Sequence, residues 1–127
     1  MIGLPESVKI QLFTDAVDMR KGFDGLSGLV MSAGEDVYSG HLFVFLSRRR
    51  DRVKILTFQK GGFVLWYKRL ERGRFKPLRA ALEVERIELD STELTLLLDG
   101  IDISRVKRPA YWQPKKVAKR IDNVAKT

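Results

Sequence analysis

Hydrophobic and polar positions alternate near the start of the chain. Val8, Ile10 and Leu12 are separated by single polar residues, which is the two-residue period of a strand with one buried face. This pattern predicts a strand over residues 7–13.

The next segment changes to helical spacing. The carboxylate of Asp18 can accept hydrogen bonds from the free amides of a first helical turn, so we predict that Asp18 is the N-cap of a helix. Gly34 is predicted to end this helix. The apolar residues between these two positions recur every three or four residues, and they are Met19, Phe23, Leu26, Leu29, Val30 and Ala33.

Three short apolar runs follow, at residues 41–46, 53–58 and 63–67. Each run is nearly continuous rather than alternating, which is typical of strands covered on both faces. The connections SRRRD and QKGG have the length of hairpin loops, so we predict a three-stranded antiparallel meander. Burial statistics favour Trp66, in the third run, as a core residue.

Residues 76–100 are predicted to contain one strand and one helix. Residues 85–89 are predicted to be a strand, whereas residues 76–85 have both helical and strand character and stay unassigned. Asp90 followed by Glu93 resembles a capping box, which predicts a helix that begins there and ends at Gly100. Its core-facing residues are predicted to be Leu94, Leu97 and Leu98.

Beyond Ser104 the chain is rich in lysine and arginine and poor in aliphatic residues. Such a composition cannot bury enough apolar surface to order itself. A chain of 127 residues, 44% of them hydrophobic, suffices for one core. We therefore predict one α+β domain over residues 1–104, built from a small antiparallel β-meander and two helices, and a flexible basic tail over residues 105–127.

Charge changes this picture, because the formal net charge of +8 is unevenly distributed. Residues 48–79 contain twelve basic and two acidic side chains, residues 83–102 have a net charge of −6, and the tail has +7. So much like charge on a small sheet indicates a polyanionic partner.

The meander predicts where this charge gathers, because alternate turns of a meander share one end of the sheet. The guanidinium group of arginine can donate two parallel hydrogen bonds to phosphate oxygens, so we predict nucleic-acid binding at this end of the sheet. The candidate residues are Arg48, Arg49, Arg50, Arg52, Lys54, Lys68, Arg69, Arg72, Arg74 and Lys76. In the tail, Tyr111 and Trp112 suit either base stacking or docking into a protein groove, with Lys115 and Lys116 as further contacts.

Catalytic chemistry has few candidates. The chain has no cysteine and one histidine, which excludes disulfides, thiolate nucleophiles and multi-histidine metal clusters. His41 opens an apolar run, which favours a histidine bonded to backbone over a general base. We therefore predict no catalytic residue, no metal site and no cofactor. A metal-dependent nuclease would need carboxylates that converge on the metal. The acidic residues available for this are Asp18, Asp24, Asp51 and Glu71, and their spacing in the sequence is not distinctive.

Location and assembly are less strongly marked. No apolar run approaches the roughly 18 residues of a membrane span, and the first residues lack the pattern of a signal peptide. We therefore expect a cytoplasmic protein that does not cross a membrane. No pattern indicates an oligomeric state. The charges at residues 18–24, among them Asp18 and Arg20, are expected to form surface ion pairs.

Four segments in fixed order carry a family resemblance: DMRKGFDGL, SGHLFVF with RRRDRVKIL, KRLERGRF and LLLDGID. Together they resemble the TnpB accessory proteins, the second open reading frame products of the insertion-sequence 66 family of bacterial mobile elements. The resemblance covers most of residues 4–104. It implies a role that supports transposition beside a separate, larger transposase, and it implies no catalytic residue.

These observations lead to one main hypothesis and two alternatives. The main hypothesis is a non-enzymatic accessory protein that binds DNA, at the ends of the element, through the candidate basic residues. The first alternative is an interaction module that docks on the transposase through the acidic block at residues 83–102 or through the tail. The weaker alternative is a metal-dependent nuclease.

Overall fold

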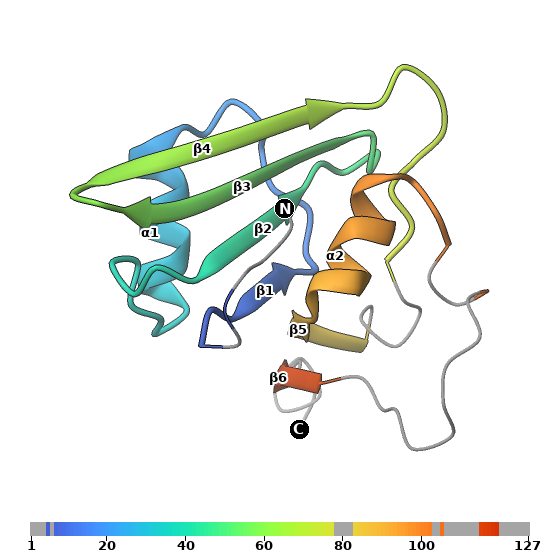
Figure 1. Cartoon of the computed structure of the whole chain (residues 1–127). Helices are drawn as coiled ribbons and strands as arrows, with labels where there is room; N and C mark the ends of the chain where they lie inside the picture. Colours follow the sequence, from blue (N-terminus) through green and yellow to red (C-terminus); the bar gives the residue numbers. More distant parts are fainter. Residues whose placement is uncertain (1–4, 6, 78–82, 103–104, 106–114, 120–127) are drawn as a thin grey trace, which may run out of the picture.

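The two most apolar runs of the chain form the central strands β2 (Leu42–Leu46) and β3 (Arg52–Gln59). The computed structural model describes residues 5, 7–77, 83–102, 105 and 115–119. The other elements are β1 (Ile10–Phe13), α1 (Phe23–Ser32), β4 (Gly62–Arg69), β5 (Val84–Leu89), α2 (Ser91–Leu98) and β6 (Lys115–Lys119). One mixed sheet with two helices results, which confirms the α+β class (Figure 1).

The strands form one six-stranded sheet in the order β4-β3-β2-β1-β5-β6. Strands β2, β3 and β4 are the predicted antiparallel meander. Strand β1 runs parallel to β2, and α1 connects the two strands. Strand β5 pairs antiparallel with the other edge of β1. The sheet is therefore larger than the predicted meander, because β1, β5 and β6 extend it beyond β2.

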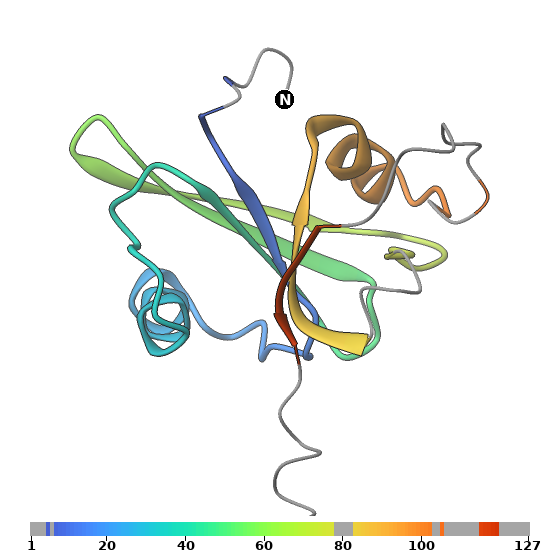
Figure 2. The same ribbon diagram turned by 90° about the horizontal axis from the view of Figure 1, so that it is seen from below.

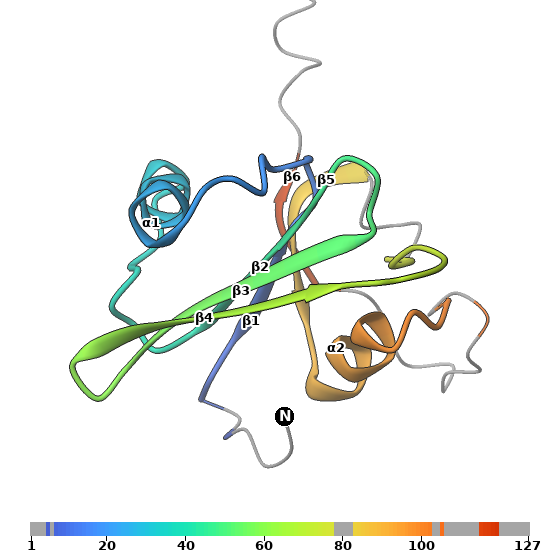
Figure 3. The same cartoon turned by 90° about the horizontal axis from the view of Figure 1, so that it is seen from above.

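The two helices cover opposite faces of the sheet, as Figures 2 and 3 show. Successive residues of a strand point to opposite faces of the sheet. Phe43 therefore packs with Leu26 of α1, in what we call the α1-side cluster, and Val44 packs with Leu97 of α2, in the α2-side cluster. Leu26 and Val30 of α1 and Leu97 of α2 are fully buried in these two clusters. Coverage of both faces explains why the runs in β2 and β3 are continuous, as predicted.

Strand β4 differs from β2 and β3 because it lies at the edge of the sheet. Val64, Trp66 and Tyr67 are 47%, 42% and 49% exposed. The prediction that Trp66 is a core residue is therefore wrong. Composition alone does not separate an apolar edge strand from a central one, since only the number of neighbouring strands differs.

Helix α1 begins later than predicted. Its N-cap is Gly22, which makes no side-chain cap, so the prediction that Asp18 caps this helix is wrong. The end of the helix is confirmed. Gly34 has φ +82°, and its amide donates to the carbonyl of Met31 (2.9 Å), while the Glu35 amide donates to Val30 (3.1 Å).

Helix α2 has the predicted capping box. The Glu93 amide donates to Asp90 Oδ1 (2.7 Å), and the Asp90 amide donates to Glu93 Oε1 (2.9 Å). Leu94, Leu97 and Leu98 are buried, and the helix ends before Gly100, as predicted.

The region predicted as a basic tail contributes strand β6, which pairs antiparallel with β5. The sequence did not predict this strand. Residues 106–114 and 120–127, with the candidates Tyr111 and Trp112, lie outside the described residues. None of the helices in the described part of the chain is both long and apolar enough to cross a membrane.

Candidate nucleic-acid interface

The loop between β2 and β3 is a tight turn that presents arginines. The Ser47 amide donates to the Arg52 carbonyl (3.0 Å), and the Arg50 amide donates back to Ser47 (3.0 Å). The Ser47 hydroxyl accepts from the Arg52 amide and donates to Asp51 Oδ1, each at 3.1 Å. With its backbone held in this way, the loop leaves Arg48 and Arg49 exposed.

A second basic segment, which follows β4, is bonded to the same loop. The Leu70 amide donates to the Asp51 carbonyl (2.8 Å), and the Phe75 amide donates to the Arg50 carbonyl (2.7 Å). Phe75 is buried in the α2-side cluster and anchors the segment. The two segments lie at one end of the sheet in Figure 1. We call their basic residues the basic rim, and its members are Arg48, Arg49, Arg50, Arg52, Arg69, Arg72, Arg74 and Lys76.

The basic rim has few acidic partners. Arg69 lies 3.7 Å from Glu71, and both side chains are largely exposed. The other seven members make no ion pair with any residue that the structure describes. Strands β3 and β4 even place Arg52 directly opposite Arg69. Like charges at this spacing repel each other, so a bound anion would stabilise this end of the protein.

A surface cavity of about 410 Å³ lies against the basic rim, between residues 17–20 and residues 47–52. Arg48, Arg49 and Arg52 line one side, and Arg20 lines the other. The sequence did not single out Arg20 as a binding residue. Its position beside the rim depends on how the segment before α1 crosses the sheet, and local sequence does not encode that path.

Asp18 and Arg20 form the expected surface ion pair at this cavity. The Arg20 guanidinium donates to both carboxylate oxygens of Asp18, with Nη2 2.7 Å from Oδ2, and the Arg20 amide also donates to Oδ1 (2.9 Å). The hydrogen bonds from the Arg20 side chain and amide lower the pKa of Asp18 from 3.8 to about 2. The same contact raises the pKa of Arg20.

We expect an NMR titration of the Asp18 carboxyl to give a pKa of about 2, and the Arg20→Ala variant to return it towards 3.8. Because the folded-state pKa is depressed, the contribution of this pair to stability is present above about pH 4 and is lost as the pH falls towards 2. A wild-type midpoint near 3.8 would show that the pair does not form in solution.

The ammonium groups of two of the candidate lysines are hydrogen-bonded within the chain. Lys54 is 7% exposed, and its Nζ donates to the carbonyls of Met19 (2.7 Å) and Lys21 (2.8 Å). The Nζ of Lys68 donates to the carbonyl of Leu98 (2.8 Å) at the end of α2. Both side chains tie neighbouring segments to the sheet, so we leave these two residues out of the basic rim.

The remaining candidates lie elsewhere. Lys115 and Lys116 belong to β6, on the edge opposite β4, where they lie 3.4 Å from Glu88 and 3.8 Å from Glu83. The structure therefore does not bring them to the basic rim. His41 Nδ1 accepts a hydrogen bond from the Lys9 amide (3.0 Å), which confirms its role as a histidine bonded to backbone.

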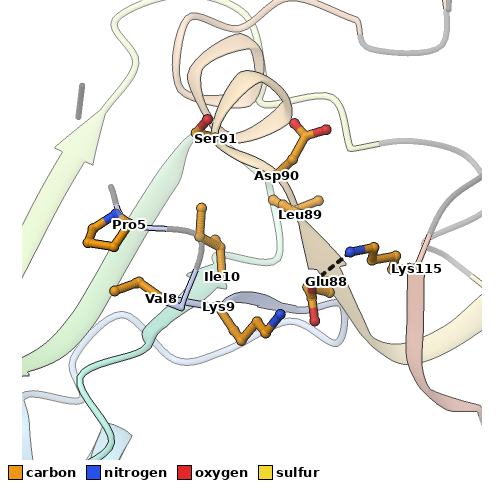
Figure 4. A pocket seen from close by; sticks show the side chains of 9 residues that line it. All are labelled: Pro5, Val8, Lys9, Ile10, Glu88, Leu89, Asp90, Ser91 and Lys115. Atoms are coloured by element: carbon orange, nitrogen blue, oxygen red, sulfur yellow. Dashed lines mark hydrogen bonds and ion pairs between the residues drawn. The ribbon is translucent and has the colours of Figure 1, made fainter. Parts of the chain in front are cut away.

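A cavity of about 490 Å³ lies between β1, β5 and the start of α2, and Figure 4 shows its lining. Three of its charged groups are engaged within the chain: Glu88 pairs with Lys115, and Asp90 caps α2. In the described ranges, no three His, Cys, Asp or Glu side chains gather to hold a metal ion, so the nuclease alternative gains no support.

Comparison with known proteins gives consistent matches. The family model described as IS66 Orf2 like protein matches residues 8–108. The uncharacterized protein y4jC of Sinorhizobium fredii is 37% identical over 119 residues, which is 93% of this chain and 100% of the relative. The uncharacterized protein y4hO of the same strain is 32% identical over 118 residues, covering 92% and 99%. No solved structure matches the chain significantly.

Proposed function

Because this chain belongs to the family of IS66 Orf2-like proteins, accessory proteins of insertion-sequence elements, we propose that it supports transposition by binding DNA through the basic rim. The proposed DNA is the end of the element, the proposed partner is the transposase of the same element, and the proposed compartment is the cytoplasm. No catalytic step is proposed for this chain.

The observation that carries the proposal is the convergence of two arginine-rich segments without matching carboxylates. Backbone hydrogen bonds from Leu70 and Phe75 hold the segment after β4 against the β2–β3 loop. Arginine presents planar forks that bind phosphate oxygens in pairs, and a row of them follows a nucleic-acid backbone. The surface is therefore suited to DNA phosphates.

Contacts of this kind determine affinity and orientation rather than sequence choice. The members of the basic rim are all arginine or lysine, whose charges match phosphate oxygens. We therefore propose that preference for element ends, where it exists, depends on DNA shape or on the transposase.

The acidic block favours the transposase alternative less than its charge suggested. Glu83 and Glu88 pair with lysines of β6, while Asp90 and Glu93 are used in the cap of α2. These carboxylates already have partners within the chain. Less of the charge of the acidic block is therefore left for a contact with another protein.

The proposal predicts salt-sensitive binding to a labelled terminal-repeat duplex and to a scrambled duplex. If six to eight rim residues contact phosphates, affinity should fall by roughly 2,000- to 20,000-fold between 50 and 200 mM salt, because counterions are released on binding. Fluorescence anisotropy across this range measures the slope. No binding to either duplex at 50 mM salt would overturn the proposal and favour docking on the transposase.

A further inference from the structure

Strand β4 presents an unpaired and partly apolar edge. It pairs with β3 over eight residues without a register shift, and no described strand pairs with its outer side. Figure 3 shows β4 as the outermost strand, away from both helices along much of its length. Val64 and Trp66 share one face of the strand, and Tyr67 points to the other.

The turn that joins β3 to β4 determines which backbone groups point outward. Lys60 (φ 48°) and Gly61 (φ 82°) form a two-residue turn, in which the flanking pair Gln59–Gly62 is hydrogen-bonded. Hydrogen bonding then alternates along β4. The N–H and C=O groups that point away from β3 belong to Phe63, Leu65, Tyr67 and Arg69.

The opposite edge of the sheet carries the features that discourage strand pairing, and β4 does not. Strand β6 is five residues long, its register with β5 shifts twice, and Lys115 and Lys116 lie on it. Strand β4 has no proline, and its charges, Lys68 and Arg69, lie at one end. Short, irregular and lysine-rich edges resist association, whereas long regular ones promote it.

We propose that two copies of this chain pair antiparallel along β4, about a two-fold axis at Trp66. This register places the outward backbone groups of Leu65 opposite those of Tyr67 in the second copy. The two Trp66 side chains meet on one face as a pair without backbone hydrogen bonds, the geometry in which opposing side chains lie closest.

The charges of β4 favour a second copy as the occupant. In this register Lys68 lies opposite Val64 of the second copy, and Arg69 lies opposite Phe63, so no like charges face each other. A parallel arrangement would place Lys68 beside Lys68. The antiparallel arrangement also carries the two basic rims to opposite ends of a continuous sheet, with the two Arg69 residues roughly 20 Å apart along the strand direction.

This pairing does not depend on DNA and responds to salt in the opposite direction. Each copy has a net charge of +8, so the two repel each other, and salt screens this repulsion. Association between copies should therefore tighten as salt rises, whereas phosphate binding weakens. The two proposals can fail separately.

The test is sedimentation equilibrium of the whole chain at 150 and 500 mM salt. Wild type should dimerise, more tightly at 500 mM. Trp66→Lys and Trp66→Glu should each weaken dimerisation by about 100-fold, because large aromatic anchors dominate such contacts. An equimolar mixture of the two variants should form heterodimers. Met31→Lys, at a 57% exposed position on α1, is the matched control and should dimerise as wild type does.

Circular dichroism and thermal unfolding of each variant establish that it is folded, which exposure of Trp66 leads us to expect. A wild type that stays monomeric at 100 μM would overturn the inference. Undiminished dimerisation of Trp66→Lys would do the same, and failure of the mixed variants to associate would overturn the pairing about Trp66.

Discussion

Replacing Arg48 and Arg72 together by glutamate is expected to weaken DNA binding by about 100-fold at 100 mM salt. Each residue contributes one phosphate contact in the proposed interface, and a lost contact costs roughly 8-fold at this salt concentration. The introduced carboxylates add repulsion. Arg48 and Arg72 come from the two different segments of the basic rim, and both are exposed. Fluorescence anisotropy should also show a salt slope that is smaller by about 2.

A matched control variant distinguishes binding through the basic rim from a general effect of net charge. Lys9→Glu with Lys60→Glu changes the net charge by the same amount at two exposed positions. Lys60 lies in the turn before β4, at the end of the strand opposite the basic rim, and Lys9 precedes β1. This control should lose less than about 5-fold in affinity at the same salt, because its lysines lie outside the interface. Equal losses in the two double variants would show that binding depends on total charge and not on the basic rim.

Local signals in the sequence identified most elements correctly. Asp90 and Glu93 predicted the start of α2, and the continuous apolar runs predicted β2 and β3. Both features can be recognised within a few consecutive residues of the sequence. Strand β6 has no such local feature. A lysine-rich segment becomes a strand there because β5 offers a free edge, and β5 is about thirty residues away in sequence.

For the candidate site, too, local sequence predicted some features and not others. The hairpin argument correctly brought residues 48–52 and 69–74 together, since turn length determines which ends of strands meet. Counting charges then included Lys54 and Lys68, because charge says nothing about where a side chain points. The position of Lys54 between Val53 and Ile55, in a strand covered on both faces, was a signal that its side chain is buried. Buried lysines need partners, and here two backbone carbonyls supply them.

The partners of Lys54 make it a structural residue with a large expected effect. Its Nζ joins the segment before α1 to β3, and it also lies 4.8 Å from the centre of the Tyr67 ring. Lys54→Ala removes both hydrogen bonds, leaves the carbonyls of Met19 and Lys21 without this donor, and opens a cavity. We expect the free energy of unfolding to fall by about 3 kcal/mol, as judged by urea denaturation.

Lys54→Met separates the two causes, because methionine restores most of the packing but cannot donate. Its cost should be about 1–2 kcal/mol, which is the part that arises from the unpaired carbonyls. Since Lys54 is buried behind the sheet surface, the folded methionine variant should also bind DNA within about 3-fold of wild type, unlike the rim variants. A loss of stability below 0.5 kcal/mol in Lys54→Ala would contradict the structural role, and a large loss of DNA affinity in Lys54→Met would restore Lys54 to the interface.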